Sequence, residues 1–190
     1  MPSTAFQQWE TARATALDEV EQAHRGVGGD ARGRRFATER INHAYAVILA
    51  SHFQGFCRDL HAECVAFLTA NVNPPSLRPI LQADLVLHLQ LNSRNATCSS
   101  LGADFNRLGL AFWDEIEQQD ARTSRRMELL DELNVWRNAI AHQDFRNVRV
   151  SGVLRLETVR GWRRACRGLA RSFDTVLQEH LDRLIGVPPW

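Results

Sequence analysis

Apolar residues recur every three or four positions along most of the chain, which is the spacing of helices with one buried face. Within residues 4–24, for example, Phe6, Trp9 and Leu17 fall on one side of a helix. Residues 36–71 keep the same period over many turns, and their apolar stripe is broad, so they predict a long central helix surrounded by others. The alternation that is typical of strands is nearly absent. The pattern therefore predicts an all-α protein.

Further segments continue the helical pattern after "NPP" at residues 73–75, where proline ends the central helix. Gly109 weakens one of them, whereas Thr158 is a good N-cap for the last one and Gly186 stops it. The predicted helices cover residues 76–91, 101–119, 124–142 and 158–184. Short connections between such helices predict an up-and-down bundle of about five or six helices.

Three connecting segments separate the predicted helices. The glycine-rich stretch "GVGGDARGRR" (26–35) is expected to be a loop, because neither the lysine of a phosphate-binding loop nor a preceding strand is present. Residues 92–100 are polar, and residues 143–157 form a connector in which "VRVSGVLRL" (148–156) could make a short hairpin. A chain of 190 residues is expected to form one domain, with residues 1–30 as an N-terminal elaboration.

Cysteine and histidine spacing gives no sign of a metal site. The four cysteines contain no C-x-x-C pair, and Cys57 and Cys64 are seven residues apart, as expected for buried thiols on one helix face. His43, His52 and His61 are each nine residues apart, which puts neighbours on opposite sides of a helix. No metal and no cofactor are expected.

Composition points to an ordinary globular protein with an uneven charge distribution. The chain is 44% hydrophobic and 24% charged. Its longest apolar stretch, residues 44–68, is interrupted by charged residues and is not expected to span a membrane. The start of the chain does not resemble a signal peptide, so a cytoplasmic protein is expected. Residues 121–171 hold 12 arginines against 5 acids, whereas the remainder holds 11 against 17. This segment suggests a local polyanionic partner, although an arginine stripe on the last helix is expected to be a solvated face, with members Arg160, Arg163, Arg164, Arg167 and Arg171.

The sequence "RNAIAHQD" (137–144) places polar residues among small apolar ones near the end of a predicted helix. Asn134, Asn138 and His142 recur at intervals of four, with Asp131 one turn earlier, opposite a stripe of leucine, tryptophan and isoleucine. A solvated helix face in this chain would carry arginine and glutamate. The polar, nearly uncharged stripe therefore indicates a half-buried surface, either a cleft or an interface.

The chemistry that fits these residues is cleavage of a phosphodiester without a metal. His142 can take and return protons near neutral pH, and Arg137, although it points roughly 140° away on the helix, is long enough to reach the same side and neutralise a phosphoryl group. Asn138 can orient the phosphate, and in RNA the 2′-hydroxyl is the nucleophile. No carboxylate cluster is present for a two-metal mechanism.

Other roles for the same residues remain open. His142 could simply stabilise the C-terminal end of its helix, and Arg137 could form an ion pair between helices. Asn134 could be structural support, and Asp131 could pair with Arg137 or lie at the surface. Two arginines of the connector could hold flanking RNA phosphates or be solvated loop charges; they are Arg146 and Arg149.

The segment "WRNAIAH" (136–142) resembles the Arg-(Asn/His)-x₃-His signature of HEPN domains, which are all-α modules of prokaryotic defence and toxin systems. "ILASHFQGFCRDL" (48–60) is similar to the long helix of some HEPN groups, where "HFEGF" occurs. The resemblance extends from about residue 36 to residue 184. It implies a homodimer, or a pseudo-dimer, with two motifs facing each other across a composite cleft, and metal-independent cleavage of RNA that leaves a 2′,3′-cyclic phosphate.

By this resemblance, Arg137 and His142 carry catalysis and Asn138 supports it. Gln54 stands where many relatives have a glutamate; it can still form a hydrogen bond to the motif but cannot form a salt bridge with an arginine. Many HEPN domains lack nuclease activity. The alternative is therefore a non-catalytic module that binds a nucleotide, RNA or a partner protein such as an antitoxin.

Overall fold

The computed structural model describes residues 1–27, 34–146 and 153–190, and within these ranges it contains helices and no strand. The all-α prediction is confirmed. A π-helical segment, Trp9–Arg13, joins the first two helices, and 3₁₀ turns lie at Pro75–Leu77, Gln90–Asn92 and Asn106–Leu108. The helices are α1 (Thr4–Gln8), α2 (Ala14–Gly26), α3 (Arg34–Ala70), α4 (Arg78–Val86), α5 (Cys98–Phe105), α6 (Phe112–Gln119), α7 (Thr123–His142) and α8 (Leu156–Ile185).

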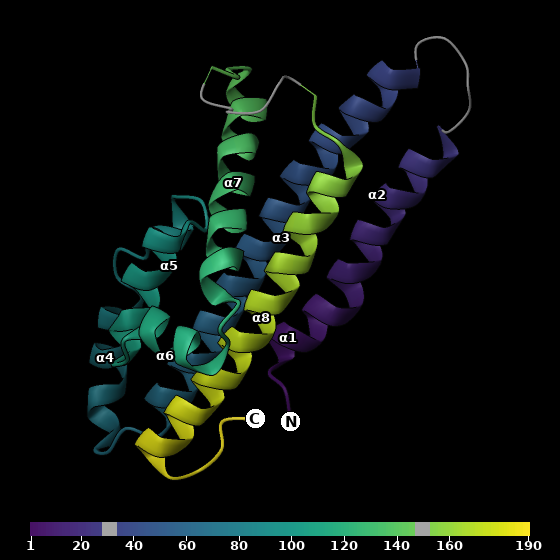
Figure 1. Cartoon of the computed structure of the whole chain (residues 1–190). Coiled ribbons are helices and arrows are strands. Elements are labelled where there is room, and N and C mark those ends of the chain that lie inside the picture. Colours follow the sequence, from purple (N-terminus) through teal and green to yellow (C-terminus); the bar gives the residue numbers. More distant parts are fainter. Residues whose placement is uncertain (28–33, 147–152) are drawn as a thin grey trace.

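The long helices α2, α3, α7 and α8 form a bundle in which each runs opposite to the one before it in the chain, so that α3 and α8, which pack together, are parallel (Figure 1). The central helix α3 packs against α2, α7 and α8, and α7 also packs against α8. The shorter helices α4, α5 and α6 gather beside one half of this bundle (Figure 1). Within the described ranges, no helix combines the length and the apolar character needed to cross a membrane.

Aromatic side chains fill the core between the long helices. Phe53 on α3 and Trp162 and Phe173 on α8 are fully buried. Trp9 in the π-helical segment lies edge-on to Phe53, with ring centroids 5.8 Å apart, and Leu17 on α2 is 1% exposed. The N-terminal helices therefore share the core of the bundle.

The segment predicted as one helix over residues 101–119 forms two helices. The chain turns at Gly109, whose φ of 88° is the left-handed conformation that glycine adopts most easily. After this turn, the side chain of Asn106 accepts a hydrogen bond from the backbone N–H of Phe112 at the start of α6. Helix α5 also begins earlier than predicted, because Thr97 and Ser100 form a reciprocal capping box before and within its first turn.

The last helix begins before the predicted N-cap. Helix α8 starts at Leu156, so Thr158 lies inside its first turn, and the N-cap residue Arg155 makes no side-chain capping bond. The possible hairpin at 148–156 falls largely outside the described residues; of its described part, Val153–Arg155 form no strand. Helix α4 stops at Val86, well short of the predicted residue 91.

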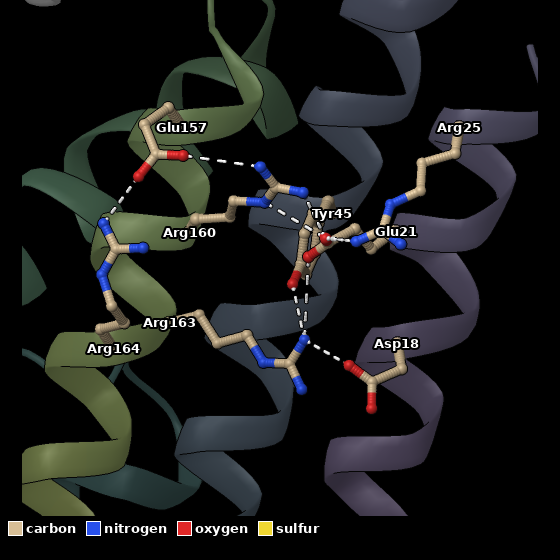
Figure 2. Close-up of polar contacts among 8 residues, drawn as sticks. All are labelled: Asp18, Glu21, Arg25, Tyr45, Glu157, Arg160, Arg163 and Arg164. Atoms are coloured by element: carbon tan, nitrogen blue, oxygen red, sulfur yellow. Dashed lines mark hydrogen bonds and ion pairs between the residues drawn. The ribbon is translucent and has the colours of Figure 1, made fainter. Parts of the chain in front are cut away.

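Part of the arginine stripe on α8 faces another helix. Arg160 binds Glu21 and Arg163 binds Asp18, so two acids of α2 meet two arginines of α8 (Figure 2). Arg163 also donates a hydrogen bond to the Tyr45 hydroxyl of α3 at 3.1 Å. The expectation of a solvated face is wrong for Arg160 and Arg163, which are half-buried. Much of the local positive charge is therefore met by acids from outside the basic segment.

Candidate functional site

The motif helix α7 ends at His142 in a turn that reverses the chain. Gln143 adopts a left-handed conformation with φ 54° and ψ 32°. Its N–H donates to the Ile140 carbonyl, and the N–H of Asp144 donates to the Ala139 carbonyl at 3.0 Å. These two bonds are the pair that closes a helix in a Schellman motif. The turn brings Asp144 back beside the last turn of α7.

An open hollow of about 280 Å³ lies at this end of α7. Two of the predicted site residues, Asn138 and His142, line it together with Asp144, Val135 and Ala139. The small side chain of Ala139 keeps the helix surface low between the polar groups. His142 is exposed and has no hydrogen-bond partner among the described residues.

Arg137 reaches the polar stripe from its neighbouring position on the helix. Its Nη1 donates to Oδ1 of Asn138 at 3.2 Å, so the guanidinium lies next to a side chain that lines the hollow. Arg137 is half-buried and forms no ion pair with an acid in the described part of the chain. Its charge is therefore available to an anion that enters beside Asn138.

Asn138 also binds a residue that sequence reasoning did not select. Nδ2 of Asn95, in the connection before α5, donates to Oδ1 of Asn138 at 2.7 Å. The contact spans 43 residues of sequence. The periodicity of α7 carries no information about a partner so far away, and Asn95 itself stands out only as part of a chance glycosylation pattern, Asn95-Ala96-Thr97.

Asn134 and Gln54 hold the connection that carries Asn95. Asn134 is 5% exposed and donates to the carbonyls of Ala96 and Leu130, each at 3.0 Å. Gln54 donates to two carbonyls of the same connection, Leu91 at 2.9 Å and Arg94 at 2.7 Å. Gln54 thus uses its amide on the adjacent connection, where the backbone at residues 91–94 lies within its reach, and not on the motif itself.

Two further predicted site residues, Asp131 and Arg146, do not line the hollow. Asp131 accepts a hydrogen bond from the Cys98 N–H at 3.4 Å, at the start of α5, and forms no ion pair with Arg137. Arg146 is exposed and binds both carboxylate oxygens of Asp144, at 2.9 and 2.6 Å. Arg149 falls outside the described residues.

Asp144 adds a negative charge that sequence reasoning did not assign. The hydrogen bond from Arg146 is the main reason why the pKa of Asp144 is held below its usual value, and the charge of nearby His142 contributes to the same effect. The carboxylate is thus charged beside the histidine, while Arg146 offsets its repulsion of an anion. No group of three or more potential metal ligands occurs among the residues that the structure describes.

The all-α fold agrees with the fold of a HEPN domain. The family model described as RiboL-PSP-HEPN matches residues 13–179, which include α2 to α7, most of α8 and the whole motif. The chain belongs to this RiboL-PSP-HEPN family. Neither a curated protein nor a solved structure matched the chain.

Proposed function

We propose that this HEPN domain is a metal-independent endoribonuclease that acts as a toxin or defence effector. The observation that carries the proposal is the hollow at the end of α7, where Asn138 and the exposed His142 lie side by side and Arg137 is bonded to Asn138. A titratable imidazole, a neutral donor and a cation are groups that can support RNA cleavage through the 2′-hydroxyl.

In the proposed reaction, His142 accepts the proton of the 2′-hydroxyl as its oxygen attacks the adjacent phosphorus. A bond from the 2′-oxygen to phosphorus forms and the bond to the 5′-oxygen breaks, and the 5′-oxygen leaves with a proton. The products are a 2′,3′-cyclic phosphate and a 5′-hydroxyl. Arg137 stabilises the charge on the phosphoryl oxygens, and Asn138 orients the phosphate.

A second copy of the chain is proposed to complete the site. At about 280 Å³, the hollow is smaller than a typical ligand pocket of roughly 300–1,000 Å³. Apart from Asp144 and the titratable His142, the hollow is lined by uncharged residues: Val135, which is 43% exposed, Asn138 and Ala139. In a chain so rich in charge, such a face favours contact with another copy, which would supply a second His142 to protonate the leaving oxygen.

Replacing the histidine tests this proposal. The variant His142→Ala is expected to lose RNA cleavage in EDTA by about 10²–10⁴-fold, the usual contribution of general acid–base catalysis, with its melting temperature unchanged. His88→Asn is the matched control, because His88 is also exposed and its positive φ of 57° suits asparagine. Full activity in His142→Ala, or equal losses in both variants, would contradict the proposed role.

The alternative is a non-catalytic HEPN module that holds a nucleotide, RNA or a partner protein such as an antitoxin in the same hollow. Within this alternative, the charged Asp144 beside His142 favours a partner protein over a nucleotide or RNA, because a carboxylate at the site repels phosphate unless Arg146 stays bound to it. Tight binding of an RNA oligonucleotide that remains intact, with the same affinity in His142→Ala, would support binding over cleavage.

A further inference from the structure

We infer that Asn95 is a positioning residue of this site: it fixes which end of the Asn138 carboxamide faces the hollow, and so which hydrogen-bonding group the site offers to RNA. This inference rests on the proposed function. It concerns a residue outside the motif, in the connection between α4 and α5, 43 residues away in sequence.

The chemistry of the partners determines the orientation of Asn138. The Arg137 guanidinium can only donate hydrogen bonds, so the Asn138 atom that it contacts at 3.2 Å must be the carboxamide oxygen. The same oxygen lies 2.7 Å from the Asn95 side chain, which must therefore present its NH₂ group. With both contacts on its oxygen, the NH₂ group of Asn138 has no partner among the residues that the structure describes, and this side chain lines the hollow.

A free NH₂ group is a hydrogen-bond donor to a phosphate oxygen. If the carboxamide turned by 180°, its oxygen would face the hollow and repel that phosphate oxygen instead. Without Asn95, the observed orientation of Asn138 would depend on Arg137, a half-buried, flexible side chain that makes one longer bond to it, at 3.2 Å. The shorter bond from Asn95 is therefore the stronger constraint on Asn138.

Asn95 can impose this orientation because its own backbone is held in place. Its carbonyl oxygen accepts a hydrogen bond from the Ser100 hydroxyl and another from the Thr97 N–H at 2.8 Å. On either side, the Ala96 carbonyl is bound by Asn134 of α7 and the Arg94 carbonyl by Gln54 of α3. Two buttressing side chains are buried, Ser100 at 2% and Asn134 at 5% exposed.

A double-mutant cycle separates positioning from a general structural effect. We expect Asn95→Ala to lower kcat for RNA by about 10- to 100-fold, as a small misplacement of a substrate-binding group does, with little change in melting temperature. In an Asn138→Ala background, the same substitution should have almost no further effect, because the group that it positions is gone. Asn71→Ala is the matched control, since Asn71 is exposed and makes one side-chain bond, to the Phe67 carbonyl.

Asn138→Asp tests the free donor directly. Aspartate keeps an oxygen for Asn95 and Arg137 but has no NH₂ group to face the hollow, so cleavage should fall at least as much as in Asn95→Ala while the fold is retained. The bound orientation can be observed without RNA: in NMR spectra, the Asn95 side-chain NH₂ protons should exchange slowly with water and those of Asn138 rapidly.

The role of Asn95 can be tested separately from the proposed nuclease function. For this test, the dissociation constant of a 2′-deoxy oligonucleotide is measured for the wild type, Asn95→Ala, Asn138→Ala and the double variant. If the wild type binds this oligonucleotide but cleaves no RNA, the proposed nuclease function fails, and the cycle on the dissociation constant still decides the role of Asn95. The inference would be overturned if Asn95→Ala lowered activity or affinity equally in the wild type and in the Asn138→Ala background. Wild-type activity in Asn95→Ala would overturn it as well. A wild type that neither binds nor cleaves would overturn both proposals.

Discussion

Gln143 sets the direction in which the chain leaves the motif. Helices that end in a Schellman motif usually place glycine at this position, because an L-residue in the left-handed conformation costs roughly 1–2 kcal/mol. Here the residue is glutamine, with φ 54°, and its side chain returns to the Ile140 carbonyl at 2.7 Å. This local bond offsets part of the strain. The turn then positions Asp144 at the hollow, with Arg146 bound to it.

Two substitutions test the turn. Gln143→Val should lower the free energy of unfolding by about 1–2 kcal/mol, because a β-branched side chain tolerates a positive φ poorly and the bond to Ile140 is lost. Gln143→Gly should stay close to wild type, since glycine adopts this conformation without strain. Urea denaturation measures both. Equal stability of the valine and glycine variants would show that the turn imposes no such constraint.

At the scale of single residues, the sequence predicted contacts within one helix and missed contacts between segments. The four-residue spacing placed Asn138 and His142 on one face, and both line the hollow. Asn95 was missed because it lies in a connection and its partner Asn138 lies on α7, 43 residues further along the chain. Asp144 was missed because its place beside His142 depends on a left-handed glutamine, which has no clear sequence signal.

At the scale of elements, ion pairs join the N-terminal helix to the last one. Glu21 of α2 has a side chain only 13% exposed and accepts hydrogen bonds from Arg160, with a further bond from Arg25 (Figure 2). The bond from Arg160 is the main reason why the pKa of Glu21 lies below its ordinary value of 4.5. The pair therefore links α2 and α8 while Glu21 remains charged.

Glu21→Gln should lower the free energy of unfolding by about 1 kcal/mol near neutral pH. Because the pKa of Glu21 is lower in the folded state, the unfolded chain binds more protons in mild acid, and this stabilisation is lost as the pH falls through the folded pKa. The stabilities of wild type and variant should converge there. Denaturation at a series of pH values measures the difference.

The matched control is Glu128→Gln, because the Glu128–Arg125 pair has side chains 66% and 70% exposed and should contribute little. A difference between wild type and Glu21→Gln that stays the same at every pH would contradict the role of the Glu21 charge.

Element boundaries were predicted less well than element type. Helical periodicity located α3 and α7, whose buried faces are long and regular. The same periodicity predicted α5 and α6 as one helix, because it does not reveal that Gly109 adopts a positive φ. It also placed the start of α8 at Thr158 on capping preference, although the helix begins at Leu156. Leu154 and Val159 are both buried, and their packing fixes the position of this segment against the core. This packing outweighs the preference of threonine for the N-cap position.

At the scale of the whole molecule, the all-α fold follows from the sequence, whereas the local charge count describes the surface incompletely. The arginine-rich segment suggested a polyanionic partner and the arginine stripe of the last helix a solvated face, yet Arg160, Arg163 and Arg167 of this stripe pair with acids of the N-terminal segment. Their partners precede them by more than 130 residues. A count of charges within one window cannot register neutralisation from so far along the chain.

The proposed homodimer predicts that Val135 lies in an interface between copies. Val135→Arg should raise the dissociation constant of the dimer by about a hundredfold, because a two-fold interface presents the new charge twice and like charges repel. Sedimentation velocity measures the change, and RNA cleavage should fall with it. Leu184→Arg is the matched control, since Leu184 is also exposed, at 56%, near the far end of α8. A dimer that tolerates Val135→Arg as well as Leu184→Arg would contradict the proposed interface.

The most direct test of the central claim is the chemistry of the RNA ends that the purified protein produces in EDTA. Mass spectrometry of the products should find 2′,3′-cyclic phosphates and 5′-hydroxyls, and none of these products with His142→Ala. An oligonucleotide with 2′-deoxy sugars throughout should remain intact. Ends with a 3′-hydroxyl, or cleavage that appears only when a divalent metal is added, would contradict a metal-independent attack by the 2′-hydroxyl.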